Sequence, residues 1–184
     1  HSTSRRQRQM CIRDSDNAFM RVNGAENIHK VLLILRHAKS SWKDKKVDDH
    51  DRPLNKRGRR EAIKMGEHLK KMNILPDTII TSSALRAIET TKYLCRYSGY
   101  NNLVEVNFSL HRGGVEAYIN ALDTVSNDKQ KLLIIGHNPD LEELASILIN
   151  RKIRIPTCTI VQLKLSIENW RSIDLHCNFR SELV

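Results

Sequence analysis

The sequence predicts an α/β protein, specifically a three-layer α/β/α sandwich in which helices cover both faces of a mainly parallel sheet. Two observations support this prediction. Short apolar runs of strand length, such as Val31–Leu35 and Leu132–Ile135, alternate along the chain with segments whose apolar residues recur at helical spacing. Both runs are apolar at every position, as in strands buried on two faces, and strands separated by helices pair in parallel.

Six strands are expected, each a short apolar or β-branched run bounded by polar residues. In chain order they are Val31–Leu35, Thr78–Thr81, Leu103–Phe108, Leu132–Ile135, Thr159–Leu165 and Ser172–His176. Trp42 and Trp170 lie outside the main runs, and we expect both side chains to serve packing.

Four helices are expected between these strands, because apolar residues recur three or four positions apart in each segment. In the first helix, for example, Ala62, Met65 and Leu69 share one face. In chain order the helices are Gly58–Met72, a helix capped by Ser82 or Ser83, Gly114–Val125, and a helix with Asn138 as its N-cap and Pro139 in its first position.

The chain of 184 residues has the length of one domain, and we expect that domain to span residues 30–184. Residues 1–29 are polar, charged and aperiodic, so we expect a disordered tail there. Within it, residues 5–15 (RRQRQMCIRDS) resemble the translation of a sequencing adapter and are expected to be an artefact. Met20 is one place where the natural chain could begin.

The hydrophobic pattern contains no membrane or secretion signal. No apolar run approaches the roughly 20 residues that span a bilayer, and no apolar core follows the N-terminal arginines. The four cysteines are scattered and form no CxxC pair, so we expect reduced, mostly buried thiols in a cytoplasmic protein. They are Cys11, Cys95, Cys158 and Cys177.

The chain is basic, with a formal net charge of +10, and the adapter-like segment contributes three of these charges. Much of the remainder lies in residues 52–71. Such a stretch suits a solvated helix face, an enzyme that attracts phosphorylated substrates, or a nucleic-acid-binding protein. Because it contains no interleaved aromatic residues and no nucleic-acid motif, we expect neither nucleic acid nor a membrane as partner.

Unusual polar residues cluster at three strand-to-helix junctions. Arg36 and His37 follow the first strand, and His137 follows the fourth. Arg86 lies in the first turn of the second helix. Any one of these residues alone is more often structural, but their recurrence at successive junctions favours one common site, because ligands bind at the carboxyl ends of parallel strands. Such a cationic site suits a phosphoryl group.

Four motifs in this order resemble the histidine phosphatase superfamily, whose members are phosphoglycerate mutase-like, and within it the SixA-type phosphohistidine phosphatases. The resemblance covers roughly residues 30–165. The motifs are Arg36-His37-Ala38-Lys39, Asp51-Arg52-Pro53-Leu54 with Gly58, Ser82-Ser83-Ala84-Leu85-Arg86-Ala87 with Thr90, and Gly136-His137-Asn138-Pro139.

The resemblance implies that His37 is the nucleophile and forms a transient phosphohistidine. It also implies that Arg36, Arg86 and His137 hold the phosphoryl oxygens, and Lys39 is expected to help bind the substrate. Guanidinium groups stay charged and contact phosphoryl oxygens in pairs, so they can stabilise the transition state without a metal. No residues have metal-ligand spacing, and we expect neither a metal nor another cofactor.

The sequence departs from the superfamily in two ways. Ala38 stands where the superfamily more often has glycine, although the short phosphatase branch shares this alanine. The carboxylic acid that protonates the leaving oxygen in the larger family has no clear counterpart. Asp44, His111, Glu116 or no residue at all could take this role. An imidazole leaving group needs such an acid less than an alkoxide does.

These patterns predict a monomeric, metal-independent phosphatase that removes phosphoryl groups from phosphohistidine on a protein, such as a phosphotransfer domain. Small phosphorylated molecules are the alternative substrates, for a phosphomonoesterase or a phosphomutase. A mutase generally needs insertions that enclose its substrate, for which this chain has little room. A non-catalytic module that binds phosphate or nucleic acid is the remaining alternative, and it is prompted only by the basic stretch.

Overall fold

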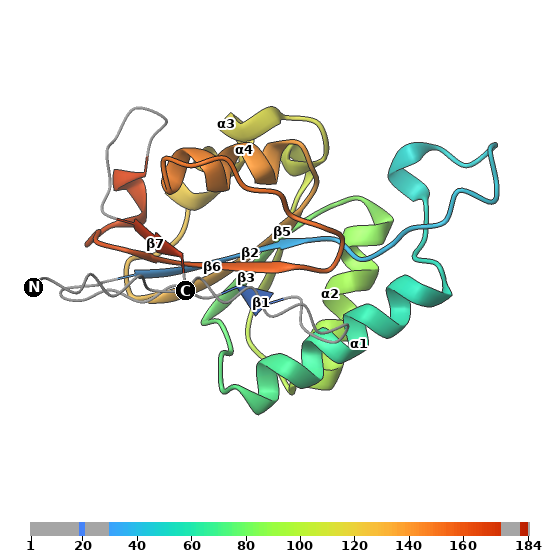
Figure 1. Ribbon diagram of the computed structural model, residues 1–184, viewed down its shortest axis with the longest axis horizontal. Helices are drawn as coiled ribbons and strands as arrows, with labels where there is room; N and C mark the ends of the chain where they lie inside the picture. The colour runs from blue at the N-terminus through green and yellow to red at the C-terminus, as the bar shows by residue number, and fades with distance from the viewer. Residues whose placement is uncertain (1–18, 21–29, 174–180, 184) are drawn as a thin grey trace, which may run out of the picture.

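The computed structural model describes residues 19–20, 30–173 and 181–183 and consists of one sheet with helices on both faces (Figure 1). The expected tail and adapter-like segment lie almost entirely outside the described residues. Of residues 1–29, only Phe19–Met20 are described, and they form the short strand β1. The expected division between tail and domain stays a prediction.

The sheet has the strand order β1-β6-β2-β5-β3-β4, and β7 also pairs with β6. Its central strands β2, β5 and β3 are parallel neighbours, and β4 and β1 are parallel to β3 and β6. Among the strand pairs of the described residues, only β2–β6 and β6–β7 are antiparallel, which confirms the prediction of a mainly parallel sheet. The remaining strand bounds are Lys30–Arg36 (β2), Thr78–Ser82 (β3), Val104–Asn107 (β4), Lys131–Gly136 (β5), Ile160–Leu165 (β6) and Ser181–Leu183 (β7).

Helices α1 (Lys56–Lys71) and α2 (Leu85–Ser98) cover one face, and α3 (Gly114–Asp123) and α4 (Asp140–Leu148) cover the other (Figure 1). Successive side chains of a strand point to opposite faces, so the apolar run of β2 serves two cores. Leu33 and Leu35 pack with α1 and α2, whereas Leu32 and Ile34 pack with α3 and α4. None of the described helices is long and apolar enough to cross a membrane.

Two predicted helix caps are wrong by one or two residues. Ala84, not Ser82 or Ser83, is the N-cap of α2, because the Ser82 hydroxyl bonds to a histidine beyond the helix. Pro139, not Asn138, is the N-cap of α4, and the Asn138 side chain instead donates to the Ile155 carbonyl.

Two other predictions are wrong, one for a strand near the C-terminus and one for the packing of a tryptophan. Ser172 ends the 3₁₀ turn η3 (Trp170–Ser172) instead of starting a strand, and residues 174–176 lie outside the described residues. Trp170 is fully buried as expected, but Trp42 is 69% exposed. The Trp42 ring stacks on the Arg52 guanidinium, whose carbon lies 3.6 Å from the ring centroid, so it covers a charge and not the core.

Candidate active site

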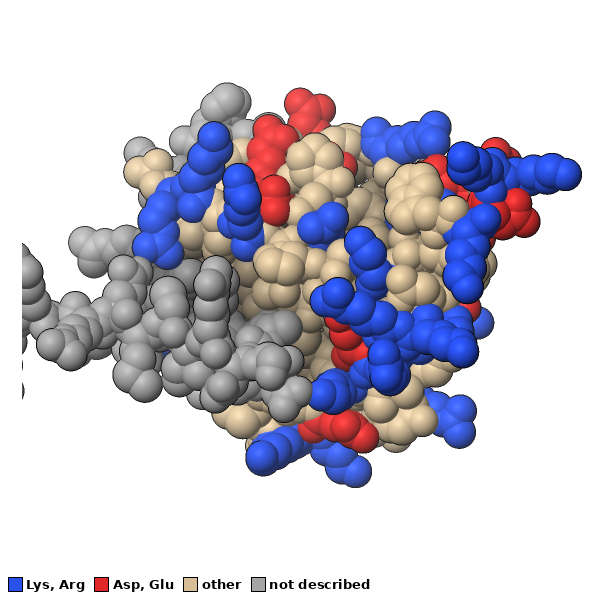
Figure 2. All heavy atoms as spheres, turned by 45° about the vertical axis from the view of Figure 1, so that its right-hand side comes forward, with Lys and Arg blue, Asp and Glu red and all other residues tan. Residues whose placement is uncertain are grey.

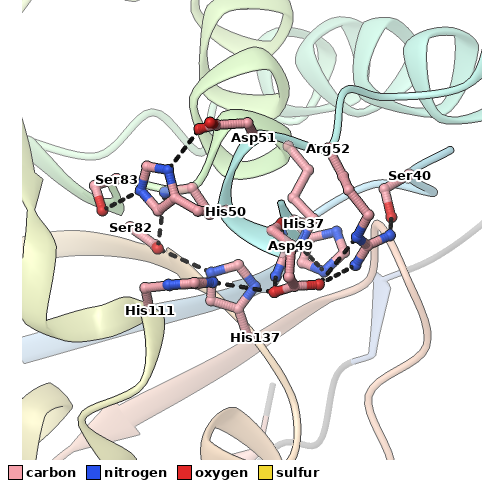
Figure 3. Close-up of polar contacts among 12 residues, drawn as sticks. His37, Ser40, Asp49, His50, Asp51, Arg52, Ser82, Ser83, His111 and His137 are labelled. Carbon is pink, nitrogen blue, oxygen red and sulfur yellow. Dashed lines mark hydrogen bonds and ion pairs between the residues drawn. The ribbon is translucent and has the colours of Figure 1, made fainter. Parts of the chain in front are cut away.

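The carboxyl ends of β2 and β5 bring the two predicted histidines together. Arg36 and Gly136 are register partners, so His37 and His137 leave adjacent strands at the same level. The His37 amide donates to the Gly136 carbonyl at 3.0 Å, and the two imidazole centroids lie 5.0 Å apart. Figure 3 shows both rings in one polar cluster. The prediction that these junctions share one edge is confirmed.

His37 is buried and has one defined tautomer. Its Nδ1 lies 2.8 Å from the Ala38 carbonyl oxygen, which can only accept, so Nδ1 carries the proton and Nε2 carries the lone pair. Burial lowers the pKa of His37 to about 4, and the nearby charges of Arg86 and Arg36 act in the same direction. At neutral pH the ring is therefore uncharged, with Nε2 as its basic nitrogen.

Arg86 connects His37 to a carboxylate that the sequence did not single out. Its Nε donates to His37 Nε2 at 3.3 Å. Its Nη1 donates to the Asp49 backbone carbonyl, and its Nη2 lies 3.1 Å from Asp49 Oδ2. Thr90, one turn further along α2, accepts from the Ala38 amide at 3.0 Å and donates to the Arg86 carbonyl. This bond ties the turn after His37 to the helix that carries Arg86.

Arg36 lies beside the cluster but is held by the loop before β6. Its Nη1 donates to the Ile155 carbonyl at 2.9 Å, and its Nε is buried with no partner among the described residues. An unpaired, buried donor next to His37 is free to bind an incoming anion. Lys39 differs: its side chain is exposed and makes no contact with the cluster within the described residues.

His137 is held by contacts with the end of β3 and with α3. Its Nε2 lies 2.8 Å from Ser82 Oγ, and its Nδ1 is buried with no partner in the described part of the chain. Burial lowers the pKa of His137 to about 2, with His37 and Arg86 adding to the effect. Its amide donates to the Tyr118 hydroxyl at 3.0 Å. A side chain at Gly136 would strike this hydroxyl, so the Gly-His sequence at the strand end is a packing requirement.

Of the three predicted acids, only His111 reaches the cluster. It ends the 3₁₀ turn η2 (Phe108–His111), its Nε2 lies 3.1 Å from Asp49 Oδ2, and its ring centroid is 5.6 Å from that of His137. The Asp44 carboxylate accepts from the Lys46 amide on an exposed loop. Glu116 is exposed on α3 and lines a separate hollow.

The 3₁₀ turn η1 (Asp49–Asp51) supplies Asp49, which the sequence analysis missed, and is followed by Arg52 of the second motif. Asp49 and the buried Arg52 form an ion pair at 2.8 Å. Arg52 also donates to Ser40 Oγ at 2.7 Å, and its charge helps to lower the pKa of His37. The motif around Arg52 could have indicated Asp49. A buried arginine is almost always paired, and acidic residues stand just before Arg52 in the sequence.

Exposed basic side chains gather on the side of the molecule that carries α1 and the segment 39–55 (Figure 2). They include Lys39, Lys43, Lys45, Lys46, Lys56, Arg57 and Arg60. The predicted basic stretch is therefore mostly a solvated helix face. In the described ranges, no three His, Cys, Asp or Glu side chains are placed to hold a metal ion.

Residues 32–122 match the family model described as histidine phosphatase superfamily (branch 1). An uncharacterized chloroplastic protein of Arabidopsis thaliana is 32% identical over 154 residues, which cover 78% of this chain and 70% of the relative. A solved structure named as a phosphohistidine phosphatase SixA from Agrobacterium tumefaciens has a TM-score of 0.68 at 25% identity, covering 73% of this chain and 91% of that one. A protein histidine phosphatase SixA with bound tungstate has a TM-score of 0.69 at 22% identity, covering 83% and 96%.

Proposed function

Because the chain belongs to branch 1 of the histidine phosphatase superfamily, we propose that it is a phosphatase whose reaction passes through phosphorylated His37. The observation that carries this proposal is the state of His37: a buried, neutral imidazole with Nδ1 protonated and Nε2 aimed at an arginine. A neutral imidazole held in this tautomer is a competent nucleophile at neutral pH.

In the first step, the Nε2 lone pair forms a bond to phosphorus while the bond from phosphorus to the leaving group breaks. The leaving group takes the bonding electron pair: an imidazole already protonated on its other ring nitrogen leaves as a neutral ring, whereas an alkoxide also takes a proton from water or from a general acid. The charges of Arg86 and Arg36 both act on His37, and such fixed guanidinium charges stabilise the equatorial oxygens. In the tautomer in which Nε2 of His137 accepts from the Ser82 hydroxyl, its unpaired Nδ1 carries the proton and can donate to a phosphoryl oxygen.

In the second step, water attacks phosphorus and the N–P bond breaks. The electron pair returns to Nε2, inorganic phosphate leaves, and the water proton passes to solvent or phosphate. Division into two transfers replaces one difficult displacement by two easier ones. The hydrogen bond from Nδ1 to the Ala38 carbonyl stabilises positive charge on the ring in the intermediate, so the same contact serves both steps.

The favoured substrate is phosphohistidine on a protein. A protonated imidazole leaves without help from an acid, which suits a site in which the Asp49 carboxylate is engaged by two arginines. The exposed basic surface over α1 and residues 39–55 suits a macromolecular substrate with acidic residues (Figure 2). Two structural neighbours carry the names phosphohistidine phosphatase SixA and protein histidine phosphatase SixA.

A small-molecule phosphomonoesterase is the second candidate, and the position of His111 favours it. A histidine hydrogen-bonded to Asp49, with its ring near His137, could protonate an alkoxide leaving group. The two candidates differ in their dependence on this side chain, and substrate profiles of the His111 variant separate them.

The decisive experiment traps the intermediate. The protein is mixed with a radiolabelled phosphohistidine peptide, quenched in alkali, and analysed for a label that is stable in base and lost in acid, as a phosphoramidate is. We expect one labelled site at His37 and no label in His37→Asn. His68→Asn, which changes a histidine in the last turn of α1, is the matched control and should be labelled normally.

Turnover is measured in parallel with phosphohistidine, p-nitrophenyl phosphate and sugar phosphates, with and without EDTA. Label on a residue other than His37 would contradict the mechanism. Turnover that disappears with EDTA and returns with a divalent metal would contradict it as well.

A further inference from the structure

The geometry points to Asp49 as the residue that sets the affinity of this site for phosphoryl groups, because its carboxylate competes with them for the donors of Arg86. This inference rests on the proposed function only in assuming that a phosphoryl group binds beside His37. It adds a role for a residue that belongs to none of the predicted motifs.

Asp49 engages both terminal nitrogens of Arg86. Nη1 donates to its backbone carbonyl, and Nη2 donates to its carboxylate at 3.1 Å. The third nitrogen, Nε, donates to His37. A guanidinium has five N–H groups, and bidentate binding of a phosphoryl group needs two that point the same way. Asp49 therefore occupies one proton on each nitrogen of the fork.

The Asp49 carboxylate is negatively charged where the substrate is also negative. Burial alone would raise the pKa of Asp49, but hydrogen bonds from Arg52 and His111 and the charge of Arg86 hold it well below its usual range. An anion bound by Arg86 would approach this carboxylate within a few ångströms. Phosphoryl binding must therefore either displace the carboxylate or overcome its repulsion.

The surroundings of Asp49 allow it to withdraw. It begins a three-residue 3₁₀ turn, and its side chain is 36% exposed. Arg52 would stay in place, because it also donates to Ser40 Oγ and stacks on Trp42. Withdrawal of the Asp49 carboxylate thus frees Nη2 of Arg86, while Arg52 keeps its contacts with Ser40 and Trp42.

The test is direct binding of inorganic phosphate and of tungstate, measured by calorimetry, which needs no turnover. Asp49→Asn keeps the size of the side chain and one of its two acceptor oxygens, and removes its charge. We expect this variant to bind both anions about tenfold more tightly than the parent. Asp48→Asn is the matched control: it makes the same change of net charge at the neighbouring exposed residue, which has no side-chain contact with Arg86 among the described residues. It should bind as the parent does.

Three outcomes would overturn the inference. Weaker binding by Asp49→Asn would show that the carboxylate only holds Arg86 in position. Equal gains in Asp48→Asn and Asp49→Asn would show a general effect of charge. Equal binding by Arg86→Ala and the parent would place the anion elsewhere and remove the proposed function as well. If Asp49→Asn has a lowered thermal midpoint, Asp49→Ser provides the same comparison.

Discussion

The Nε of Arg86 lies 3.3 Å from Nε2 of His37, so a buried guanidinium from α2 donates a hydrogen bond to the imidazole nitrogen that carries no proton. This contact joins the ends of β2 and the start of α2. It orients the lone pair of His37 and places a fixed positive charge where a phosphoryl group would lie next to that nitrogen.

Arg86→Ala should lower kcat by about 10²–10³, or about 2.7–4 kcal/mol of transition-state stabilisation, which is typical of losing one preorganised donor. Arg86→Lys keeps the charge but loses the planar fork, so it should recover only part of the loss. Steady-state kinetics with p-nitrophenyl phosphate measure both variants. Arg60→Ala, on the exposed face of α1, is the control and should match the parent. An active Arg86→Ala would remove this residue from the mechanism.

The His37 ring should stay neutral down to about pH 4, because burial lowers its pKa from 6.5 to about 4. NMR of the imidazole nitrogens during a pH titration measures this directly. Between pH 6.5 and 4 the unfolded chain binds a proton at this position and the folded chain does not. The free energy of unfolding should therefore fall as the pH drops through that window. His37→Asn should fall less steeply, and a ring that titrates near pH 6.5 would refute the assignment.

Gly58→Ala should destabilise the protein even though alanine is the better helix former by about 1 kcal/mol. A Cβ at this position would lie 2.1 Å from the Lys39 carbonyl oxygen, so the start of α1 could not stay against the turn that follows His37. Thermal unfolding should show a lower midpoint, and turnover should fall with it. Lys56→Ala, at the exposed first residue of α1, should leave both unchanged. An unaltered midpoint in Gly58→Ala would show that the turn can move.

Phosphohistidine and p-nitrophenyl phosphate should turn over well, and sugar phosphates about 10²–10⁴-fold more slowly, if no general acid assists the leaving group. His111→Asn should then change phosphohistidine turnover only modestly. Asp44→Asn and Glu116→Gln, both outside the cluster, serve as controls. If His111 proves essential for every substrate, it is the acid and the phosphomonoesterase is the better candidate. Equal kcat/KM for sugar phosphates and phosphohistidine in all three variants would contradict the leaving-group argument itself.

A chain that starts at Lys30 should keep the thermal midpoint and turnover of the full chain. The described part of residues 1–29 is β1, which pairs with β6 only through Phe19 and Met20, while β6 is also held along its length by β2. Comparison of the two chains by calorimetry and steady-state kinetics tests this expectation. A loss of either quantity would mean that residues 1–29 belong to the fold.

Local patterns were sufficient for most of the fold. Buried parallel strands are continuous apolar runs, so β2 and β5 are visible in the sequence, and amphipathic spacing identifies α1. The edges were harder to predict. Trp42 is a large apolar residue, as is typical of a core, but it covers Arg52 at the surface. Ala84 and not Ser82 is the N-cap of α2, because the Ser82 hydroxyl bonds to His137 instead. Both positions depend on partners distant in the sequence, and the secondary-structure propensity of a residue does not include such partners.

The sequence by itself determined that four site residues lie at the ends of strands or at the start of a helix, and the parallel sheet brings such positions to one edge. They are Arg36, His37, Arg86 and His137. Only the tertiary structure decided which neighbours they have. The η1 turn folds over the start of α2 and inserts Asp49 between Arg86, Arg52 and His111, whose separations along the chain range from three to 62 residues. Contacts of this kind arise from loop packing, which has no periodic signature, and they determine the charge, tautomer and free donors of the site.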